Sequence, residues 1–151
     1  MLKKISDINL EEKESWEGKV FLTLDTDWAC DEVLNYVIDI IEEYKNPKVT
    51  WFLTHKTKVL KRLSKNKNFE IGIHPNFNKL LDGDFPSGQT KDEIVNNLIN
   101  LVPGAVSVRS HSMTQSSRII DVFYKKGLKF DCNHFIPHYS QNSIFPWKHW
   151  N

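Results

Sequence analysis

Two aspartates, two histidines and one arginine stand in three short segments of the chain, and each segment directly follows an apolar run. Asp25 and Asp27 follow the first such run, His74 follows the third, and Arg109 and His111 follow the fourth. Carboxylates and neutral imidazoles bind divalent metal ions, and a carboxylate can also accept a proton from water. A neighbouring guanidinium keeps a carboxylate ionised. Together these residue types suit metal-assisted hydrolysis.

Each of these residues also has an ordinary structural explanation when it is considered alone. Asp25 and Asp27 could form an acidic turn, and His74 could be a histidine that is satisfied by hydrogen bonds. Arg109 could end its strand in an ion pair, with His111 on the surface. The argument for a site is their joint placement, because the carboxyl ends of parallel strands share one face of an α/β structure, where ligands bind.

Alternating strand and helix patterns must position these residues. Apolar β-type runs predict strands at residues 20–24, 49–53, 69–73, 105–108 and 128–130. Helical spacing predicts helices between them, at residues 31–44, 56–64, 90–102 and 116–126. Residues 75–89 are predicted to form a loop. Alternation of this kind predicts an α/β fold, in which parallel βα units form a sheet with right-handed crossovers.

Local patterns refine the predicted helices. Asp31 is a candidate N-cap of the first helix, in which five apolar residues recur at helical spacing, namely Val33, Val37, Ile40, Ile41 and Tyr44. Thr90 and Glu93 have the spacing of a capping box at the start of the third helix. In the last helix, three residues are expected to face the core, namely Ile119, Ile120 and Phe123.

Composition and charge limit the class of protein. The chain has 151 residues, of which 40% are hydrophobic and 26% charged, and this predicts one globular domain. A formal net charge of +1 gives no support for a nucleic-acid partner. No apolar run suits a signal peptide or a membrane span, and Cys30 and Cys132 cannot form a disulfide framework. We therefore expect a cytoplasmic protein, with a polar lead-in at residues 1–18 and one α/β domain at residues 19–151.

Aromatic and amide side chains near the predicted site could bind a sugar. Five aromatic residues could line a sugar-binding cleft, namely Trp28, Trp51, Phe77, Trp147 and Trp150, although Trp51 stands inside a strand and suits the core. We predict Trp28, Asn76, Phe77 and Asn78 as the substrate-binding residues. Four further histidines have weaker claims to a role in the site, namely His55, His134, His138 and His149.

The order of these motifs resembles the polysaccharide deacetylase (NodB-like) superfamily of carbohydrate esterases. The segments that carry the resemblance are residues 24–27, 50–53, 70–74 and 108–109. Residues 74–77, 109–111 and 145–147 resemble a branch associated with surface-polysaccharide and lipopolysaccharide biosynthesis. The resemblance implies a distorted, incomplete (β/α) barrel. It also implies metal-dependent removal of an acyl group, such as acetyl, from an amino sugar.

By position, the resemblance implies a catalytic pair and leaves one catalytic residue unassigned. Asp25 would be the general base, and Arg109 would be the arginine that orients it. The family also has a late histidine that acts as general acid, and nothing after His111 fits its place well. A barrel of this type usually needs about 200–250 residues. We therefore expect a barrel that is truncated, is completed by a partner, or stays an open sheet.

The resemblance implies a metal site with one substitution in its ligand set. Asp27 would be a metal ligand, and His74 matches the first histidine of the family's His-x-x-x-His pair. Asn78 stands where the second histidine would be. We infer that His111 supplies the missing imidazole from a neighbouring strand, because an imidazole suits a borderline metal better than an amide does. The expected cofactor is a divalent metal, zinc.

Two other functions stay open at this point. A strand followed by Asp-x-Asp also begins phosphatases of the haloacid dehalogenase type, in which Asp25 would be the nucleophile and Asp27 would lie beside a magnesium ion. Those enzymes usually have Thr or Val where this chain has Ala29, and they give no role to His74 or His111. The other alternative is a degenerate domain that binds glycan without turnover. For the deacetylase, the expected partner is an amino sugar, as a small molecule or an oligosaccharide, and the oligomeric state is left open.

Overall fold

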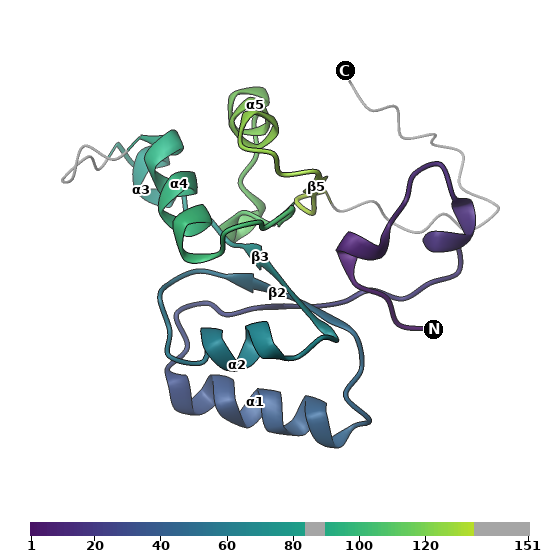
Figure 1. Ribbon diagram of the computed structural model, residues 1–151. Coiled ribbons are helices and arrows are strands. Elements are labelled where there is room, and N and C mark those ends of the chain that lie inside the picture. The colour runs from purple at the N-terminus through teal and green to yellow at the C-terminus, as the bar shows by residue number, and fades with distance from the viewer. Residues whose placement is uncertain (84–89, 135–151) are drawn as a thin grey trace, which may run out of the picture.

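Five parallel strands form one curled sheet (Figure 1). The computed structural model describes residues 1–83 and 90–134, and in this part of the chain each strand pairs with the next in the order β1-β2-β3-β4-β5. The strands are β1 (Leu22–Asp25), β2 (Val49–Leu53), β3 (Phe69–Ile73), β4 (Ser107–Val108) and β5 (Phe130–Asp131). Every pairing between them is parallel, which confirms the predicted α/β fold of βα units in an incomplete barrel.

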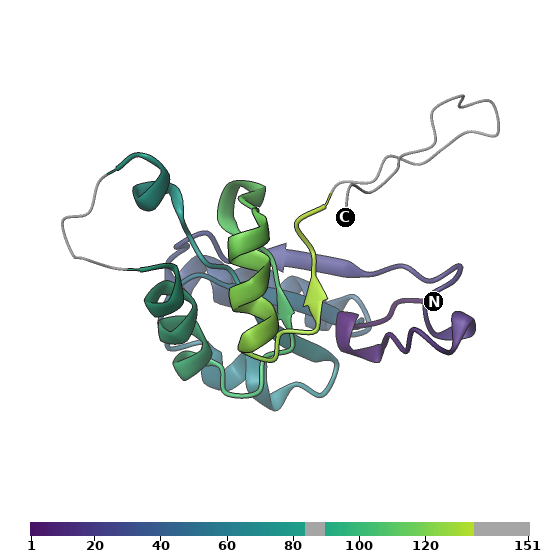
Figure 2. The ribbon, with the colours of Figure 1, turned by 90° about the horizontal axis from the view of Figure 1, so that it is seen from above.

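Helices lie between the strands (Figures 1 and 2). They are α1 (Asp31–Glu43), α2 (Leu60–Lys65), α3 (Asn78–Leu81), α4 (Lys91–Leu101) and α5 (Ser117–Lys125). Three 3₁₀ turns accompany them, η1 (Ile5–Asp7), η2 (Lys13–Ser15) and η3 (His111–Met113). Helix α3 lies in the segment predicted as a loop, and α2 begins at Leu60 rather than at Lys56. Within the described ranges, no helix has both the length and the apolar character needed to cross a membrane.

The starts of α4 and α1 test two predictions about helix caps. Thr90 accepts a hydrogen bond from the backbone N–H of Glu93 (3.2 Å), and Glu93 accepts one from that of Thr90 (2.6 Å), so the predicted capping box is confirmed. The prediction that Asp31 caps α1 is wrong, because Cys30 is the N-cap residue. The Asp31 carboxylate instead accepts a hydrogen bond from the Thr57 hydroxyl, which ties α1 to the segment after β2.

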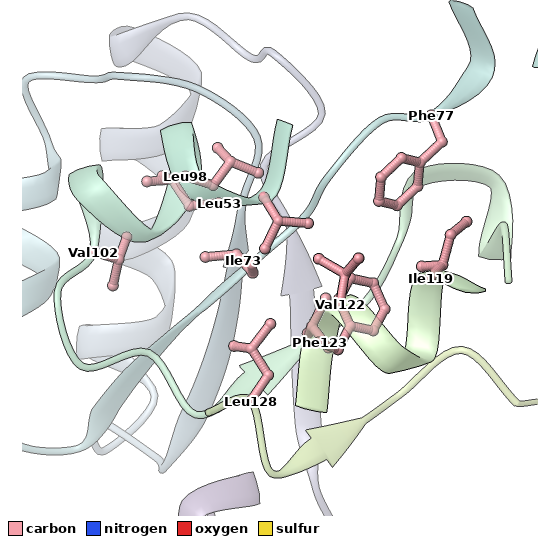
Figure 3. Close-up of a cluster of buried hydrophobic side chains, with 11 residues drawn as sticks. Leu53, Ile73, Phe77, Leu98, Val102, Ile119, Val122, Phe123 and Leu128 are labelled. Atoms are coloured by element: carbon pink, nitrogen blue, oxygen red, sulfur yellow. The ribbon is translucent and has the colours of Figure 1, made fainter. Parts of the chain in front are cut away.

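The helices pack on one apolar face of the sheet in two clusters. One cluster joins the sheet to α4 and α5 (Figure 3), through Leu53, Ile73, Phe77, Val95, Leu98, Val102, Val108, Ile119, Val122, Phe123 and Leu128. The other joins it to α1 and α2, through Leu34, Ile38, Ile41, Val49, Trp51, Val59, Leu63 and Phe69. Because side chains alternate along a strand, the residues between these ones face the other, inner side of the sheet.

The buried face of α1 differs from the predicted one, and that of α5 differs at one predicted residue. Of the five apolar residues that indicated α1, only Ile41 is buried, and Val33, Ile40 and Tyr44 are exposed. The residues that pack on the sheet are Leu34, Ile38 and Ile41. Arg62 of α2 bonds to Asn35, Asp39 and Glu42, which lie beside this buried stripe on the side away from Val33 and Tyr44, so the contact with α2 favours this rotation of α1. In α5, Ile119 and Phe123 are buried as predicted, whereas Ile120 is exposed and Val122 is buried.

The inner face of the sheet is polar, and the N-terminal segment is bonded to it. Glu70 on β3 accepts hydrogen bonds from the hydroxyls of Ser107 on β4 (2.7 Å) and Thr50 on β2 (3.0 Å). Backbone N–H groups of η1 add two more, from Ile5 to the Thr50 hydroxyl (3.1 Å) and from Ser6 to the Glu70 carboxylate (2.7 Å). The polar lead-in thus contributes its own backbone groups to this face.

Gly72 on β3 is closely surrounded on the inner face. A Cβ atom at this position would lie 2.5 Å from Ser107 Oγ, 2.7 Å from the Ser107 carbonyl oxygen and 2.9 Å from the Phe52 ring. Because one of these contacts is with backbone, a side chain at position 72 would displace β4 from β3.

We expect Gly72→Ala to lower the free energy of unfolding by about 1–3 kcal/mol, the usual cost of overpacking. Urea unfolding followed by circular dichroism measures this change. Gly72→Val adds more atoms at the same place and should lower the free energy further. If both variants unfold at the urea concentration of the wild-type chain, the space around Gly72 is not limiting.

Candidate metal centre

A tight turn after β1 presents Asp27 at the carboxyl edge of the sheet. The Ala29 N–H donates to the Thr26 carbonyl oxygen (2.8 Å), and the two central residues, Asp27 and Trp28, both have positive φ (38° and 58°). Such backbone is strained for residues other than glycine. Thr54, after β2, holds the turn, because its hydroxyl accepts from the Trp28 N–H (3.1 Å) and bonds to the Thr26 hydroxyl (2.9 Å).

His74 directly follows β3 at the same edge. Its N–H donates to the Leu53 carbonyl oxygen (2.8 Å), and the residue is only 3% exposed. Its Nε2 lies 3.3 Å from Asp27 Oδ1. Burial lowers the pKa of His74, against the opposing effect of Asp25 and Asp27. Burial therefore favours the neutral imidazole, which is the form that binds metals.

His111 comes from the loop after β4. Its N–H donates to the Pro75 carbonyl oxygen (2.9 Å), which joins this loop to the one after β3. Its Nδ1 lies 3.3 Å from Asp27 Oδ1, the same oxygen that His74 faces. The His111 ring stands edge-on to those of His74 and Trp28, with centroids 5.5 Å and 5.0 Å away.

A buried asparagine that the sequence analysis missed holds the loop of His111. Asn133 is 2% exposed, and its Oδ1 accepts a hydrogen bond from the N–H of Ser110, the residue before His111 (2.6 Å). Asp131 in turn accepts hydrogen bonds from the backbone and the side chain of Asn133 (3.0 Å and 2.5 Å). The only sequence signal for Asn133 is that it comes shortly after the last predicted strand, just as each of the other site residues comes shortly after its own strand.

Asp27, His74 and His111 form a group that could hold a metal ion. Each offers one ligand atom, and the three atoms lie within 4.8 Å of one another. One carboxylate and two imidazoles suit zinc, with a fourth tetrahedral position left for water. The donor set therefore fits a divalent metal, and the identity of the metal stays a prediction.

Asp25 and Arg109 form an ion pair beside this group. Arg109 Nη1 lies 3.0 Å and 3.2 Å from the two Asp25 oxygens, and Nη2 donates to the Thr23 hydroxyl (2.5 Å). The guanidinium lies over the Phe52 ring, 4.5 Å from its centre. Asp25 Oδ1 is also 3.7 Å from His74 Nδ1. The structure thus brings the predicted base and its predicted arginine together next to the candidate metal ligands, and their catalytic roles stay predictions.

Two aromatic residues predicted to bind substrate have opposite environments. Trp28 is 47% exposed beside His111, where a ligand can reach its ring. Phe77 is 1% exposed and packs near Phe123 in the core, so the prediction that it binds substrate is wrong. Phe77 instead belongs to the apolar cluster that packs against α5 (Figure 3).

The amides predicted to bind substrate take part in local structure. The Asn76 side chain accepts a hydrogen bond from the Asn78 N–H (2.9 Å) at the start of α3. The Asn78 side chain donates to the Ser112 hydroxyl (3.4 Å), which again links the loops after β3 and β4. Their predicted roles in substrate binding stay predictions.

The remaining sequence predictions concern residues outside this group. Trp51 is buried in the core, as expected, and His55 bonds through Nδ1 to the Thr54 hydroxyl (2.8 Å). His134 lies after β5 and is not one of the three grouped ligands. His138, His149, Trp147 and Trp150, with the motif at residues 145–147, lie outside the described residues.

By its fold and its site, this protein is an incomplete (β/α) barrel with a candidate metal centre at the carboxyl ends of its strands. A family model, WbmS-like polysaccharide deacetylase, matches residues 22–151, and the chain therefore belongs to this family, which confirms the family expected from its motifs.

The chain is similar to the crystal structure of a protein from Bordetella bronchiseptica, described as a candidate polysaccharide deacetylase involved in O-antigen biosynthesis. The two are 43% identical with a TM-score of 0.86, and the match covers 99% of this chain and 61% of that one. The comparison with curated proteins gave no match.

We expect His111→Ala to weaken zinc binding much more than Asn78→Ala does. His111 Nδ1 lies 3.3 Å from Asp27 Oδ1, whereas the Asn78 amide is bonded to Ser112. Loss of the imidazole should lower zinc affinity by more than about 100-fold, since changes outside the ligand sphere alone cost about 10–100-fold. Competition against a chromophoric chelator measures the affinity of the metal-free protein. A larger loss in Asn78→Ala would assign the third ligand to the amide.

Proposed function

We propose that this chain is a zinc-dependent hydrolase that removes the acetyl group from an N-acetylated amino sugar in surface-polysaccharide biosynthesis. The observation that carries the proposal is the approach of Asp27, His74 and His111 to one another beside Asp25. Membership in the deacetylase family and the likeness to the O-antigen protein support the substrate class. Because the chain spans 61% of that protein's chain, activity of these 151 residues by themselves is part of the proposal.

Asp27, His74 and His111 are the residues that would hold the metal. Zinc bound there supplies a Lewis acid, which lowers the pKa of water toward 7 and polarises the amide carbonyl. The chain contributes the placement of the donors. The turn held by Thr54 positions Asp27, burial favours the neutral form of His74, and the loop bonded to Asn133 presents His111.

Asp25 is the proposed general base. It would accept the proton of the attacking water, and the contacts of both its oxygens with Arg109 hold it beside the candidate metal ligands. Its side chain is 25% exposed, so water can reach it. The water oxygen bonds to the acetyl carbon and the carbon–nitrogen bond breaks. The proton held by Asp25 can then pass to the leaving amine, which gives acetate and a free amino sugar.

Trp28 is the proposed platform for the sugar ring. It is the large exposed aromatic residue next to His111, and the turn of Asp27 fixes its backbone. An aromatic face offers broad apolar contact to a sugar while the ring loses little conformational freedom on binding. A sugar stacked there would bring its N-acetyl group toward the metal ligands.

The two alternative functions differ from this proposal in what they ask of the site. A phosphatase of the haloacid dehalogenase type needs Asp25 as a nucleophile and magnesium as the metal. Magnesium prefers oxygen ligands, whereas two of the three grouped donors are imidazoles, and both oxygens of Asp25 contact Arg109. A binding domain without turnover would use the same site residues, so only a measurement of turnover separates it from a deacetylase.

We expect the zinc-loaded chain to release acetate and a free amine in equal amounts from N-acetylated amino sugars. A panel of free and nucleotide-linked sugars is assayed for acetate by a coupled reaction and for amine by fluorescamine. Removal of the metal with a chelator should abolish release, and added zinc should restore it. Asp27→Asn should remove both the metal and the activity.

Two results would contradict this function. Magnesium-dependent release of phosphate from phosphate esters would favour the phosphatase. Binding of the sugars by the zinc-loaded chain without release of acetate would favour the binding domain.

We expect both Trp28→Ala and Trp28→Gly to raise KM by about tenfold, the loss of ~1.4 kcal/mol of aromatic contact, with a smaller change in kcat. The two variants should differ in stability, because Trp28 has φ of 58°. Glycine adopts this backbone without strain, so the glycine variant should be about 1 kcal/mol more stable than the alanine variant. Steady-state kinetics and urea unfolding check the two effects, and an unchanged KM would exclude a sugar contact at Trp28.

A further inference from the structure

One buried nitrogen of the candidate site has no hydrogen-bond partner. His74 Nδ1 is shielded from solvent and makes no hydrogen bond. The other ring nitrogen, Nε2, faces Asp27, so Nδ1 lies on the side of the ring away from that ligand. A buried polar atom left without a partner has lost its contacts with water without gaining a hydrogen bond in their place. A hydrogen-bond partner for Nδ1 in the working site would compensate for this loss.

The Asp25 carboxylate lies beside this nitrogen. Asp25 Oδ1 is 3.7 Å from His74 Nδ1, which is slightly longer than a hydrogen bond, so a small rotation of either side chain would close the gap. Arg109 holds the same carboxylate through contacts of 3.0 Å and 3.2 Å. Arg109, Asp25, His74 and Asp27 thus form a row in which each side chain lies next to the following one.

We propose that Asp25 is a positioning residue for His74, to which Nδ1 donates a hydrogen bond when Nε2 binds the metal. An imidazole that binds a metal through one nitrogen carries its proton on the other. A carboxylate acceptor at that position fixes the tautomer, orients the ring and makes the ligating nitrogen more basic. The inference rests on the proposed metal site, and it adds that zinc affinity depends on a residue that is not a ligand.

This arrangement would make one carboxylate serve two parts of the site. Oδ1 faces His74, which leaves Oδ2 to accept the proton of water, while Arg109 contacts both oxygens. A carboxylate that acted only as a base could be removed without a change in how tightly the metal binds. A positioning carboxylate could not, and this difference makes the inference testable apart from activity.

The test compares zinc affinity in Asp25→Ala and Asp25→Asn by competition against a chromophoric chelator. Asp25→Ala removes the acceptor and should weaken zinc binding by about 10–100-fold, the range found for outer-sphere partners of metal-bound histidines. Asp25→Asn keeps an oxygen that can accept from Nδ1, so its zinc affinity should stay close to that of the wild-type chain. Both variants should lack deacetylation, since neither has a carboxylate to accept the proton.

A second readout follows the proton itself. In the zinc-loaded wild-type chain, nitrogen-15 NMR should show His74 as the Nδ1–H tautomer, with slow exchange of that proton. Asp25→Ala should speed this exchange, and Asp25→Asn should largely preserve it. The control is Asp31→Ala, because Asp31 is a carboxylate bonded to Thr57 and is not one of the grouped metal ligands. This variant should bind zinc like the wild-type chain, and circular dichroism confirms that each variant is folded.

The outcomes separate this inference from the proposed function. Zinc affinity in Asp25→Ala equal to that of the wild-type chain would overturn the positioning role and leave the deacetylase intact. An equal loss in Asp25→Ala and Asp25→Asn would also overturn it, because charge rather than the hydrogen bond would then control affinity. A wild-type chain that binds no zinc would overturn the metal site and, with it, both proposals.

Discussion

The ion pair between Arg109 and Asp25 joins β4 to β1 across the inner face of the sheet. The arginine crosses two intervening strands, and its guanidinium lies over the Phe52 ring of β2. On β3, Gly72 presents no side chain, which lets the Phe52 ring and Ser107 close over it. Removal of either partner of this partly buried ion pair would destabilise the fold, because the other charge would be left without compensation. The sequence at the centre of β2 and β3 is therefore constrained by a contact between two other strands.

The two faces of the sheet differ in the kind of side chain that they carry. The outer face carries the apolar residues that hold the helices, and alternation along each strand leaves polar residues on the inner face. There the hydroxyls of Thr50 and Ser107 bond to Glu70, and the backbone of η1 completes the network. The polar residues of the inner face thus have partners within the fold. This network lies on strands β2, β3 and β4, and the loops that carry His74 and His111 follow β3 and β4.

The sequence predicted the parts of this structure that depend on local pattern. Strand–helix alternation indicated the parallel sheet, and the position of Asp27, His74 and His111 after separate strands indicated that they lie together. It could not predict the rotation of α1, which depends on Arg62, or the burial of Phe77, which depends on packing under α5. Both rest on contacts between distant segments. Asn133 was missed for the same reason, because its partner, the Ser110 N–H, is 23 residues away in the sequence.

The two loops that supply Asp27 and His111 share a strained backbone. Asp27 and Trp28 after β1, and Ser112 and Met113 after β4, are consecutive residues with positive φ. Such backbone persists only where the surroundings determine it, and here Thr54 and Asn133 bond to the two loops. As a result, the three candidate ligand atoms lie within 4.8 Å of one another. The strained backbone of two separate loops thus places Asp27 and His111 beside His74, which is the arrangement that the proposed metal site needs.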